Sequence, residues 1–221
     1  MRIWGLFKEQ LKIDLHIHTI FSGDSSVTLE KAIRIALKVG LNGIAITDHN
    51  NVEACKKIPE NSGLTVIPGV EVTTMQGHIL GLGILQHIRQ GLSVFETVEK
   101  IHELGGLVII PHPMNPFKHS LNETILRQTR TDAVETLNGS DISPFLSRRK
   151  RVTELVRQLG LPQTGGSDAH TPDTIGRAYT LIKVEEPSIE GALHAIKRGE
   201  ITPIGKFSSV KDLIPGVWLK A

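Results

Sequence analysis

Two histidines near the amino terminus have the spacing of a metal-binding pair. In the segment Lys12–Thr19 (KIDLHIHT), one residue separates His16 from His18. Side chains alternate between the two faces of a β-strand, so both imidazoles point to one face while Leu15 and Ile17 point to the other. Two neutral imidazoles placed in this way can bind one metal ion. For this motif alone, an exposed strand face with two polar residues is the alternative.

Other histidines and acidic residues recur where predicted strands end. Of the ten histidines, six lie at such ends or in the adjoining loops, a concentration that packing does not explain. With three carboxylates they form the candidate ligand set: His16, His18, Asp24, His49, Glu71, His78, His112, Asp168 and His170. These donors are too many for one ion and indicate a cluster. Mixed imidazole and carboxylate donors favour zinc, manganese or iron over magnesium or calcium.

Apolar segments of strand type alternate with amphipathic helical segments along the chain. The predicted strands cover residues 12–19, 43–49, 64–72, 78–84, 107–111, 132–138, a segment from 161 onward, and 179–184. The main predicted helices cover residues 28–40, 93–104, 144–159 and 189–197. This alternation, repeated about seven times, predicts parallel βαβ units that close into an α/β barrel related to the TIM fold. The active site of such a barrel lies at the carboxyl ends of its strands, where the candidate ligands fall.

The length and composition are those of a soluble, single-domain protein. The chain has 221 residues, of which 39% are apolar and 22% charged, so we assign one domain to residues 1–221. The net charge of +2 requires no polyanionic partner. No apolar run reaches the ~20 residues of a membrane helix, and the amino terminus lacks a signal-peptide core. We therefore expect a cytoplasmic protein with no membrane partner.

Four further features have structural interpretations. The single Cys55 excludes an internal disulfide and a multi-cysteine zinc site, and we expect it to be structural. Four consecutive bases at 148–151 are typical of a solvated helix face. The lead-in around Trp4 and the tail around Trp218 carry no motif of known chemistry. We expect the lead-in to pack as a short structural segment and the tail to cover one end of the barrel.

Taken in order, the motifs resemble those of the PHP family, whose name stands for polymerase and histidinol phosphatase. The matching segments are Asp14-Leu-His16-Ile-His18-Thr19, Ile46-Thr-Asp-His49, Glu71, His78-Ile-Leu-Gly, Pro111-His112-Pro113 and Ser167-Asp168-Ala-His170. The motif-bearing part runs from about residue 12 to 180, and residues 181–221 hold the final helix and the tail. The resemblance implies a distorted TIM-like (β/α)7 barrel with a metal cluster that hydrolyses phosphate esters. Ser25, where many relatives have glycine, alters a turn and leaves the ligand Asp24 intact.

The resemblance also implies how the ligands divide among two or three divalent transition-metal ions. One ion is expected at His16, His18, Glu71 and Asp168, a second at Glu71, His78 and His112, and a third at Asp24, His49 and His170. A water between two such ions has a lowered pKa and attacks phosphorus, while the ions neutralise charge on the phosphoryl oxygens. No serine or cysteine nucleophile is then needed.

Other side chains are candidates for catalysis and substrate binding. Asp48 can orient the neighbouring imidazole of His49, and Asp14 can do the same for the first pair. A plain structural hydrogen bond is the alternative for each carboxylate. His119, in a loop at the barrel mouth, can act on a leaving group. Arginine makes bidentate bonds to phosphate, for which the candidates are Arg148, Arg149 and Arg177, with simple surface exposure as the alternative.

These features favour metal-dependent hydrolysis of phosphate esters by a phosphomonoesterase whose substrate is a small phosphorylated metabolite or nucleotide. A nuclease or phosphodiesterase acting on short oligonucleotide ends is one alternative, although the near-neutral charge argues against long nucleic acid. A non-catalytic regulatory module would have lost ligands, and here none is missing. Amide or lactone hydrolysis by the same water is the remaining alternative. The sequence defines neither the substrate nor the oligomeric state.

Overall fold

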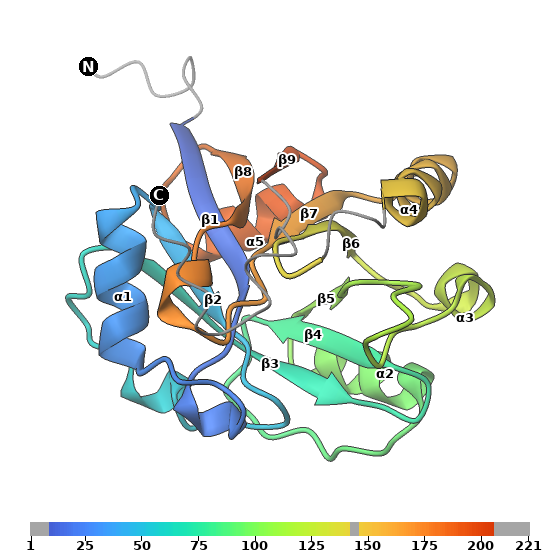
Figure 1. Ribbon diagram of the computed structural model, residues 1–221, viewed down its shortest axis with the longest axis horizontal. Coiled ribbons are helices and arrows are strands. Elements are labelled where there is room, and N and C mark those ends of the chain that lie inside the picture. Colours follow the sequence, from blue (N-terminus) through green and yellow to red (C-terminus); the bar gives the residue numbers. More distant parts are fainter. Residues whose placement is uncertain (1–8, 142–145, 206–221) are drawn as a thin grey trace, which may run out of the picture.

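The computed structural model describes residues 9–141 and 146–205 of the chain. The described strands are β1 (Glu9–Ile17), β2 (Gly43–Ile46), β3 (Thr65–Thr73), β4 (His78–Leu82), β5 (Leu107–Ile110), β6 (Ala133–Asn138), β7 (Gln163–Gly166), β8 (Ala178–Val184) and β9 (Ile201–Gly205). The helices are α1 (Leu29–Lys38), α2 (Val94–Glu103), α3 (Glu123–Gln128), α4 (Leu146–Gln158) and α5 (Ile189–Lys197). Figure 1 shows the strands at the centre of the molecule, with α1, α3 and α4 at its periphery.

All of the described strands belong to one sheet that curls into a nearly closed barrel. Their order is β7-β6-β5-β4-β3-β2-β1-β8-β9. The segment after β7 returns to the end of β1, where the amide of His18 donates to the carbonyl of Ala169 at 3.0 Å. The amide of Asp168 donates in turn to the carbonyl of His16 at 2.8 Å. The predicted α/β barrel is therefore confirmed, and its closure joins two segments that carry candidate ligands.

Two strands interrupt the parallel arrangement that a regular βαβ repeat predicts. Strand β4 is antiparallel to both β3 and β5. It follows β3 after residues 74–77 alone, which are too few for the crossover that a parallel connection needs. Strand β8 is antiparallel to β1 and pairs with β9, a strand in the region after the final predicted helix. As a result, β4 begins at the end of the barrel where its antiparallel neighbours β3 and β5 finish.

Helix α5 closes the barrel at the end opposite the candidate ligands. Its residues Ala192, Ala195 and Ile196 pack in one core cluster with Leu11 and Ile13 of β1 and with apolar residues of β2 to β6. All three α5 residues are fully buried. Burying each large aliphatic side chain contributes roughly 1.5–3 kcal/mol to folding. The carboxyl ends of the parallel strands are left as the open mouth of the barrel.

The end of β1 departs from regular strand geometry. Its pairing with β2 shifts register between Asp14 and Ile17. Leu15 consequently packs in the core cluster that contains α5, whereas Ile17 packs in the cluster beneath α1. The regular alternation that predicts one shared face for Leu15 and Ile17 therefore does not hold here. The convergence of His16 and His18 is retained, because their Nε2 atoms lie 3.1 Å apart.

Strand β7 approaches β1 so closely that Gly166 has no room for a side chain. A Cβ atom there would lie 2.5 Å from Cβ of His16 and 2.7 Å from Oε1 of Glu135. We expect Gly166→Ala to lower the free energy of unfolding by about 1–3 kcal/mol, because the ligand-bearing end of β1 must shift. Thermal unfolding followed by circular dichroism should show a Tm reduced by roughly 2–12 °C. An unchanged Tm would contradict this account of the β1–β7 contact.

Cys55 lies under the barrel wall as a buried free thiol. Its Sγ accepts a hydrogen bond from the amide of Gly69 at 3.4 Å. Burial raises the pKa of the thiol to about 11, so the reactive thiolate is rare at neutral pH. These contacts agree with the structural role expected for Cys55.

Some sequence predictions concern residues outside the described ranges. These are the lead-in around Trp4, the start of the predicted helix 144–159, and the tail around Trp218. The remainder of that helix is α4. Among the described residues, no helix is both long and apolar enough to span a bilayer.

Candidate metal centre

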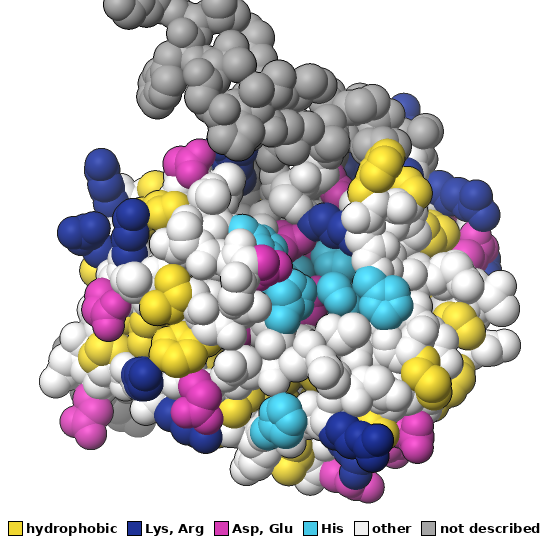
Figure 2. Space-filling model, turned by 60° about the horizontal axis from the view of Figure 1, so that its bottom comes forward, with side chains coloured by type: hydrophobic (Ala, Val, Ile, Leu, Met, Phe, Trp, Pro, Cys, Tyr) yellow, Lys and Arg dark blue, Asp and Glu magenta, His cyan; other side chains and the backbone are white. Residues whose placement is uncertain are grey.

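The predicted ligands gather at the open mouth of the barrel. His16 lies at the end of β1, Glu71 lies near the end of β3, and His112 and Asp168 follow β5 and β7. His78 is the first residue of β4, and it reaches the same mouth because β4 runs in the opposite direction. Figure 2 shows the histidine side chains clustered around a hollow, with acidic side chains among them.

Glu71 occupies the centre of this cluster. Its side chain is 1% exposed, and imidazole nitrogens surround both of its carboxylate oxygens. The contacts are Oε2 with His16 at 3.3 Å, His18 at 3.2 Å and His49 at 3.2 Å, and Oε1 with His78 at 3.0 Å and His112 at 3.1 Å. Because the two oxygens face different histidines, this carboxylate can serve two ions at once.

Asp168 is the second buried carboxylate, and its two oxygens have different partners. Oδ1 lies 3.3 Å from Nε2 of His18 and 3.6 Å from Nε2 of His16. Oδ2 accepts hydrogen bonds from Asn138 at 3.1 Å and from the ammonium group of Lys118. Burial opposes ionisation, but Lys118 and His16 hold the pKa of Asp168 well below its usual range. Oδ1 is therefore available, in charged form, to the histidine pair.

Hydrogen bonds from outside the cluster fix the tautomers of the first two histidines. Nδ1 of His16 lies 3.1 Å from Oε1 of Glu135, so this nitrogen carries the hydrogen. Nδ1 of His18 lies 3.0 Å from Oγ of Ser22, whose own hydrogen goes to Asp48. Both Nε2 atoms are then left to face the carboxylates, the arrangement that metal-ligating histidines show.

His112 and His170 are oriented in the same way. Nδ1 of His112 lies 3.0 Å from Oγ of Ser120, which donates its hydrogen to the carbonyl of His112 at 2.7 Å. Nδ1 of His170 donates to the carbonyl of Asp168 at 3.0 Å. Four imidazoles therefore present Nε2 to the cluster, with Nδ1–H anchored on a fixed acceptor.

Asp48 and Asp14, the two carboxylates proposed from sequence to orient imidazoles, have different surroundings. Asp48 is fully buried and accepts hydrogen bonds from Thr19 Oγ1 at 2.7 Å and Ser22 Oγ at 2.9 Å. It therefore reaches the imidazole of His18 through Ser22, and not the imidazole of His49 for which the sequence proposed it. Asp14 accepts from the amides of Ser167 at 2.8 Å and Gly176 at 3.0 Å, so it organises the backbone around the histidine pair. Burial raises the pKa of Asp14 to about 6.

Two features show that the donor set fits bound cations. Nε2 of His16 and Nε2 of His18 lie 3.1 Å apart, with their lone pairs directed into the same space. The buried Nδ1 atoms of His49 and His78 face Glu71 without forming a hydrogen bond. Such close lone pairs and carboxylate charges are unfavourable unless positive charge lies between them. Imidazole and carboxylate donors together suit zinc, manganese or iron.

The ligand atoms form overlapping groups whose members lie within 4.8 Å of one another. The groups are His16–His18–Asp168, His16–Glu71–His112, His49–Glu71–His78 and His18–His49–His170. The first three contain every ligand assigned to the two ions that share Glu71. The fourth brings His18 to His49 and His170. Asp24, 53% exposed, lies beside this group, with Oδ2 3.3 Å from Nε2 of His170 and 3.5 Å from Nε2 of His49.

Opposite charges offset burial inside the cluster. Burial disfavours a charged His16, but Asp168, Glu71 and Glu135 raise the pKa of its imidazole well above the usual value. Burial likewise opposes ionisation of Glu71, yet His16 and neighbouring imidazoles hold its pKa well below the usual range. At the edge, burial lowers the pKa of His49 to about 4. The inner cluster therefore attracts positive charge, and a cation that binds there competes with protons.

Two of the ligand positions have unusual backbone angles. His112 has φ of 30° and Asp168 has φ of 54°, a region that residues other than glycine seldom adopt. Each residue lies two positions after the end of a strand, where the chain turns to direct its side chain into the mouth. Such strain is retained where surrounding contacts enforce it, often at functional sites.

Glu135 contacts two candidate ligands without being one itself. A substitution of Glu135 therefore tests the cluster without removing a ligand. Oε1 accepts from His16 Nδ1 at 3.1 Å, and Oε2 accepts from the amide of His112 at 2.8 Å. We expect Glu135→Gln to weaken binding of Zn²⁺ or Mn²⁺ by about 10–100-fold, because the amide orients His16 poorly and lacks the charge. Competition with a chromogenic chelator measures this affinity.

The matched control for this prediction is Asp132→Asn. It alters a similar imidazole–carboxylate pair, since Asp132 Oδ2 lies 2.9 Å from Nε2 of His102, but this pair is separate from the cluster. We expect the control to bind metal like the wild type. If both variants bind with equal affinity, Glu135 has no role in metal binding.

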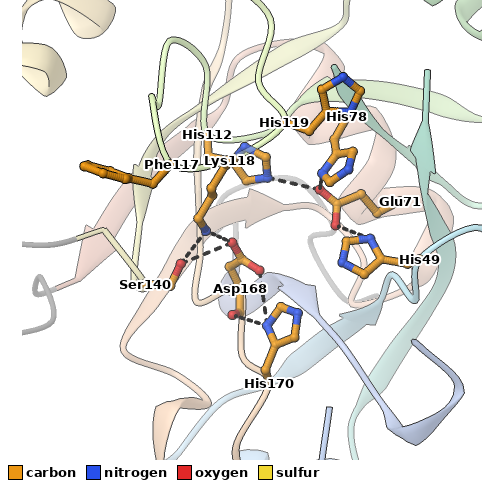
Figure 3. A pocket seen from close by; sticks show the side chains of 10 residues that line it. All are labelled: His49, Glu71, His78, His112, Phe117, Lys118, His119, Ser140, Asp168 and His170. Carbon is orange, nitrogen blue, oxygen red and sulfur yellow. Dashed lines mark hydrogen bonds and ion pairs between the residues drawn. The ribbon is translucent and has the colours of Figure 1, made fainter. Parts of the chain in front are cut away.

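A cavity of about 400 Å³ opens onto the cluster. Its lining residues are His49, Glu71, His78, His112, Phe117, Lys118, His119, Ser140, Asp168 and His170. Figure 3 shows Lys118 directed toward Asp168 and Ser140, while the imidazoles of His49, His78 and His112 face Glu71. Lys118 is the one lysine or arginine among these lining residues. Lys118 is not among the candidates predicted from the sequence, although its position next to His119 in the loop at the mouth is a usable signal.

The predicted substrate-binding residues lie in different surroundings. His119 lines the cavity, whereas the three arginines are not among the lining residues. Arg148 donates to the carbonyl of Pro113 at 2.7 Å and is paired with Asp141. Arg177 lies 3.5 Å from Asp173. Arg149 is partly buried on α4. Phosphate binding by these arginines stays a prediction.

A barrel whose mouth holds clustered histidines and carboxylates is the arrangement of a metal-dependent hydrolase. A family model described as the PHP domain matches residues 14–145, and a model described as PHP-associated matches residues 147–201. The chain belongs to the PHP family, as its motifs predict.

Sequence relatives include proteins from archaea and bacteria. An uncharacterized protein of Methanocaldococcus jannaschii is 39% identical over 142 residues, which cover 58% of this chain and 82% of the relative. A protein of Thermoanaerobacter sp. (strain X514) named a probable phosphatase is 28% identical over 214 residues, which cover 79% of this chain and 85% of the relative.

Solved structures share the fold. A two-domain protein of Bacteroides vulgatus that contains a predicted PHP-like metal-dependent phosphoesterase aligns with a TM-score of 0.72 and 20% identity, covering 90% of this chain. This chain spans 65% of that protein. The lesion-specific endonuclease Q of Pyrococcus furiosus aligns with a TM-score of 0.66 and 20% identity, covering 88% of this chain and 58% of the endonuclease. At this level of identity, both comparisons concern the fold alone.

Proposed function

We propose that this protein is a metal-dependent phosphoesterase, and specifically a phosphomonoesterase that acts on a small phosphorylated metabolite or nucleotide. The observation that carries the proposal is the central Glu71, whose two oxygens face five imidazoles at the base of a cavity. The relatives named as probable phosphatases support the same class of reaction.

The ligands of two or three ions would be those that the family motifs assign. The pair His16 and His18 would act with Glu71 and Asp168, while His78 and His112 would share Glu71. Asp24, His49 and His170 would complete the outer position. Bound there, zinc, manganese or iron supplies activation of a water for attack on phosphorus and neutralises charge on the phosphoryl oxygens.

The residues of the chain itself bind and orient the ester. The Lys118 ammonium, held on Asp168 at the cavity wall, binds a phosphoryl oxygen and adds fixed positive charge. His119, at the cavity mouth, donates or accepts a hydrogen bond at the leaving group. Asp48 keeps Ser22 oriented as acceptor for His18, so the imidazole does not rotate.

The test combines metal analysis with an ester panel. The protein is purified without added metal, its bound ions are quantified, and hydrolysis of 4-nitrophenyl phosphate and nucleoside monophosphates is measured with and without Mn²⁺. We expect two or more transition-metal ions per chain and hydrolysis that disappears in His16→Ala. Bound metal without hydrolysis of any phosphate ester would contradict the proposal.

A nuclease is the second candidate, and the structural similarity to endonuclease Q favours it. One structure of endonuclease Q contains a 27-mer duplex with an abasic lesion at the active site. Bis(4-nitrophenyl) phosphate and short oligonucleotides belong in the same panel, together with an amide and a lactone. Faster hydrolysis of diesters would assign the protein to phosphodiesterases, and hydrolysis of the amide or lactone alone would assign it to amide-type hydrolases.

A further inference from the structure

The loop between β5 and α3 presents two neighbouring side chains to the cavity in different ways. Lys118 points inward and contacts Asp168, whereas Phe117 points away from the ligand cluster at the cavity edge (Figure 3). A molecule whose phosphate lies beside Lys118 would therefore extend past Phe117 as it leaves the cavity. Position 117 thus borders the cavity next to the ammonium group that is expected to bind phosphate.

Several hydrogen bonds hold this loop in a defined shape. Asn115 is 8% exposed, and its amide donates to Asp141 at 2.8 Å. The Oδ1 atom of the same Asn115 accepts from the backbone amide of Phe117 at 2.9 Å. The amide of Met114 donates to the carbonyl of Leu121 at 2.9 Å and closes the base of the loop. The backbone that carries Phe117 is therefore held in place before any ligand binds.

Phe117 is the most exposed of the large apolar side chains described, at 74%. Single exposed apolar residues are common on protein surfaces and need no special account. Phe117 differs from Phe95 of α2, which is 43% exposed, because Phe117 also lines the cavity that contains the ligand cluster. An aromatic ring at such a position offers a flat apolar face to a bound ligand.

We propose that Phe117 forms a subsite for a planar ring, and that the substrates are nucleotides whose base stacks on it. This inference rests on the proposed phosphomonoesterase function and specifies its leaving group as a nucleoside. The volume of the cavity, about 400 Å³, is in the range of sites that bind whole small molecules. The cavity is therefore larger than a phosphate group alone requires. Stacking tolerates any base, so the subsite selects nucleotides without selecting one base strictly.

The test is a ratio of specificity constants. We compare kcat/KM for AMP with kcat/KM for ribose 5-phosphate, which carries the same phosphate on a sugar without a base, at fixed Mn²⁺. The wild type is expected to prefer AMP, and Phe117→Ala is expected to reduce the AMP to ribose 5-phosphate ratio by about tenfold. Phe117→Trp should keep the preference, because indole also stacks.

Phe95→Ala is the matched control, since it removes an exposed phenylalanine outside the cavity lining. Its ratio should equal that of the wild type. A wild type that hydrolyses both esters with the same kcat/KM, or a ratio that Phe117→Ala leaves unaltered, would overturn the subsite while leaving the phosphoesterase function intact.

A binding measurement separates failure of the subsite from failure of the proposed function. The fluorescence of 2-aminopurine riboside 5′-monophosphate is quenched when its base stacks, and this readout needs no turnover. If the wild type hydrolyses neither ester, the proposed function fails, and quenching that disappears in Phe117→Ala still supports a nucleotide subsite. Absence of quenching with the wild-type protein overturns the subsite.

Discussion

Glu71→Gln is expected to reduce phosphoesterase activity on the order of a thousandfold or more. Glutamine has nearly the same shape as glutamate, so the fold should tolerate the change. It replaces one carboxylate oxygen by an amide that has no lone pair to offer a metal, and it removes the negative charge. Because both oxygens of the carboxylate face imidazoles, an ion on the amide side would lose a ligand, and an ion on the other side would lose the charge of the carboxylate.

Metal content measured together with initial rates of 4-nitrophenyl phosphate hydrolysis checks this prediction. Glu53→Gln is the matched control, because Glu53 is 51% exposed and pairs with Lys56 on the surface. The control should retain both its metal and its activity. A Glu71→Gln protein with wild-type metal content and rate would show that Glu71 does not bridge ions.

The sequence was informative about the barrel and its ligands because both follow from local patterns. Strand periodicity locates the ends of β1, β3 and β5, and in a parallel barrel these ends must converge. The sequence therefore predicts that His16, Glu71 and His112 lie close together despite their separation in the chain. The family membership is confirmed, and the spatial clustering of the predicted ligands agrees with it.

The direction of β4 is not encoded in the apolar pattern of the strand, but it can be inferred from the length of the loop before it. Residues 74–77 separate β3 from β4, and a parallel connection cannot be made with so short a segment. This detail explains why a histidine at the start of β4 belongs to the same site as residues at strand ends. Loop length is thus a signal for ligand placement as well as for topology.

Other features depend on contacts that no local pattern encodes. Glu135 forms a hydrogen bond with His16, which lies 119 residues earlier in the chain. In the sequence, β6 has only the pattern of an ordinary buried strand. Arg148 seemed suited to phosphate because it follows a loop near the mouth, yet Asp141 and Pro113 engage its guanidinium. The pairing of Arg148 depends on how α4 packs against the barrel, and the pairing of Glu135 depends on how the barrel brings β6 to β1. A count of charges along the chain cannot reveal them.

Lys118→Met is expected to lower kcat for phosphate esters by about 10²–10³-fold, the effect of removing one preorganised group that stabilises transition-state charge. Methionine preserves much of the aliphatic stem and removes the ammonium. Lys118 lies beside Asp168, and Asp168 retains hydrogen bonds from Asn138 and Ser140 after the change. A loss in kcat with a modest change in KM would show that the ammonium stabilises negative charge that develops in the transition state.

Metal content distinguishes this role from an indirect one. If Lys118 acts only by holding Asp168 in place, Lys118→Met should lose metal, and added Mn²⁺ should restore the rate. If Lys118 binds the phosphoryl group, metal content should match that of the wild type while kcat stays low at saturating Mn²⁺. Lys197→Met is the control, because Lys197 is 69% exposed and lies 3.9 Å from Asp132, a residue outside the cavity lining. Equal rates for the two variants would remove Lys118 from the reaction and leave the metal ions as the main source of positive charge at the phosphate.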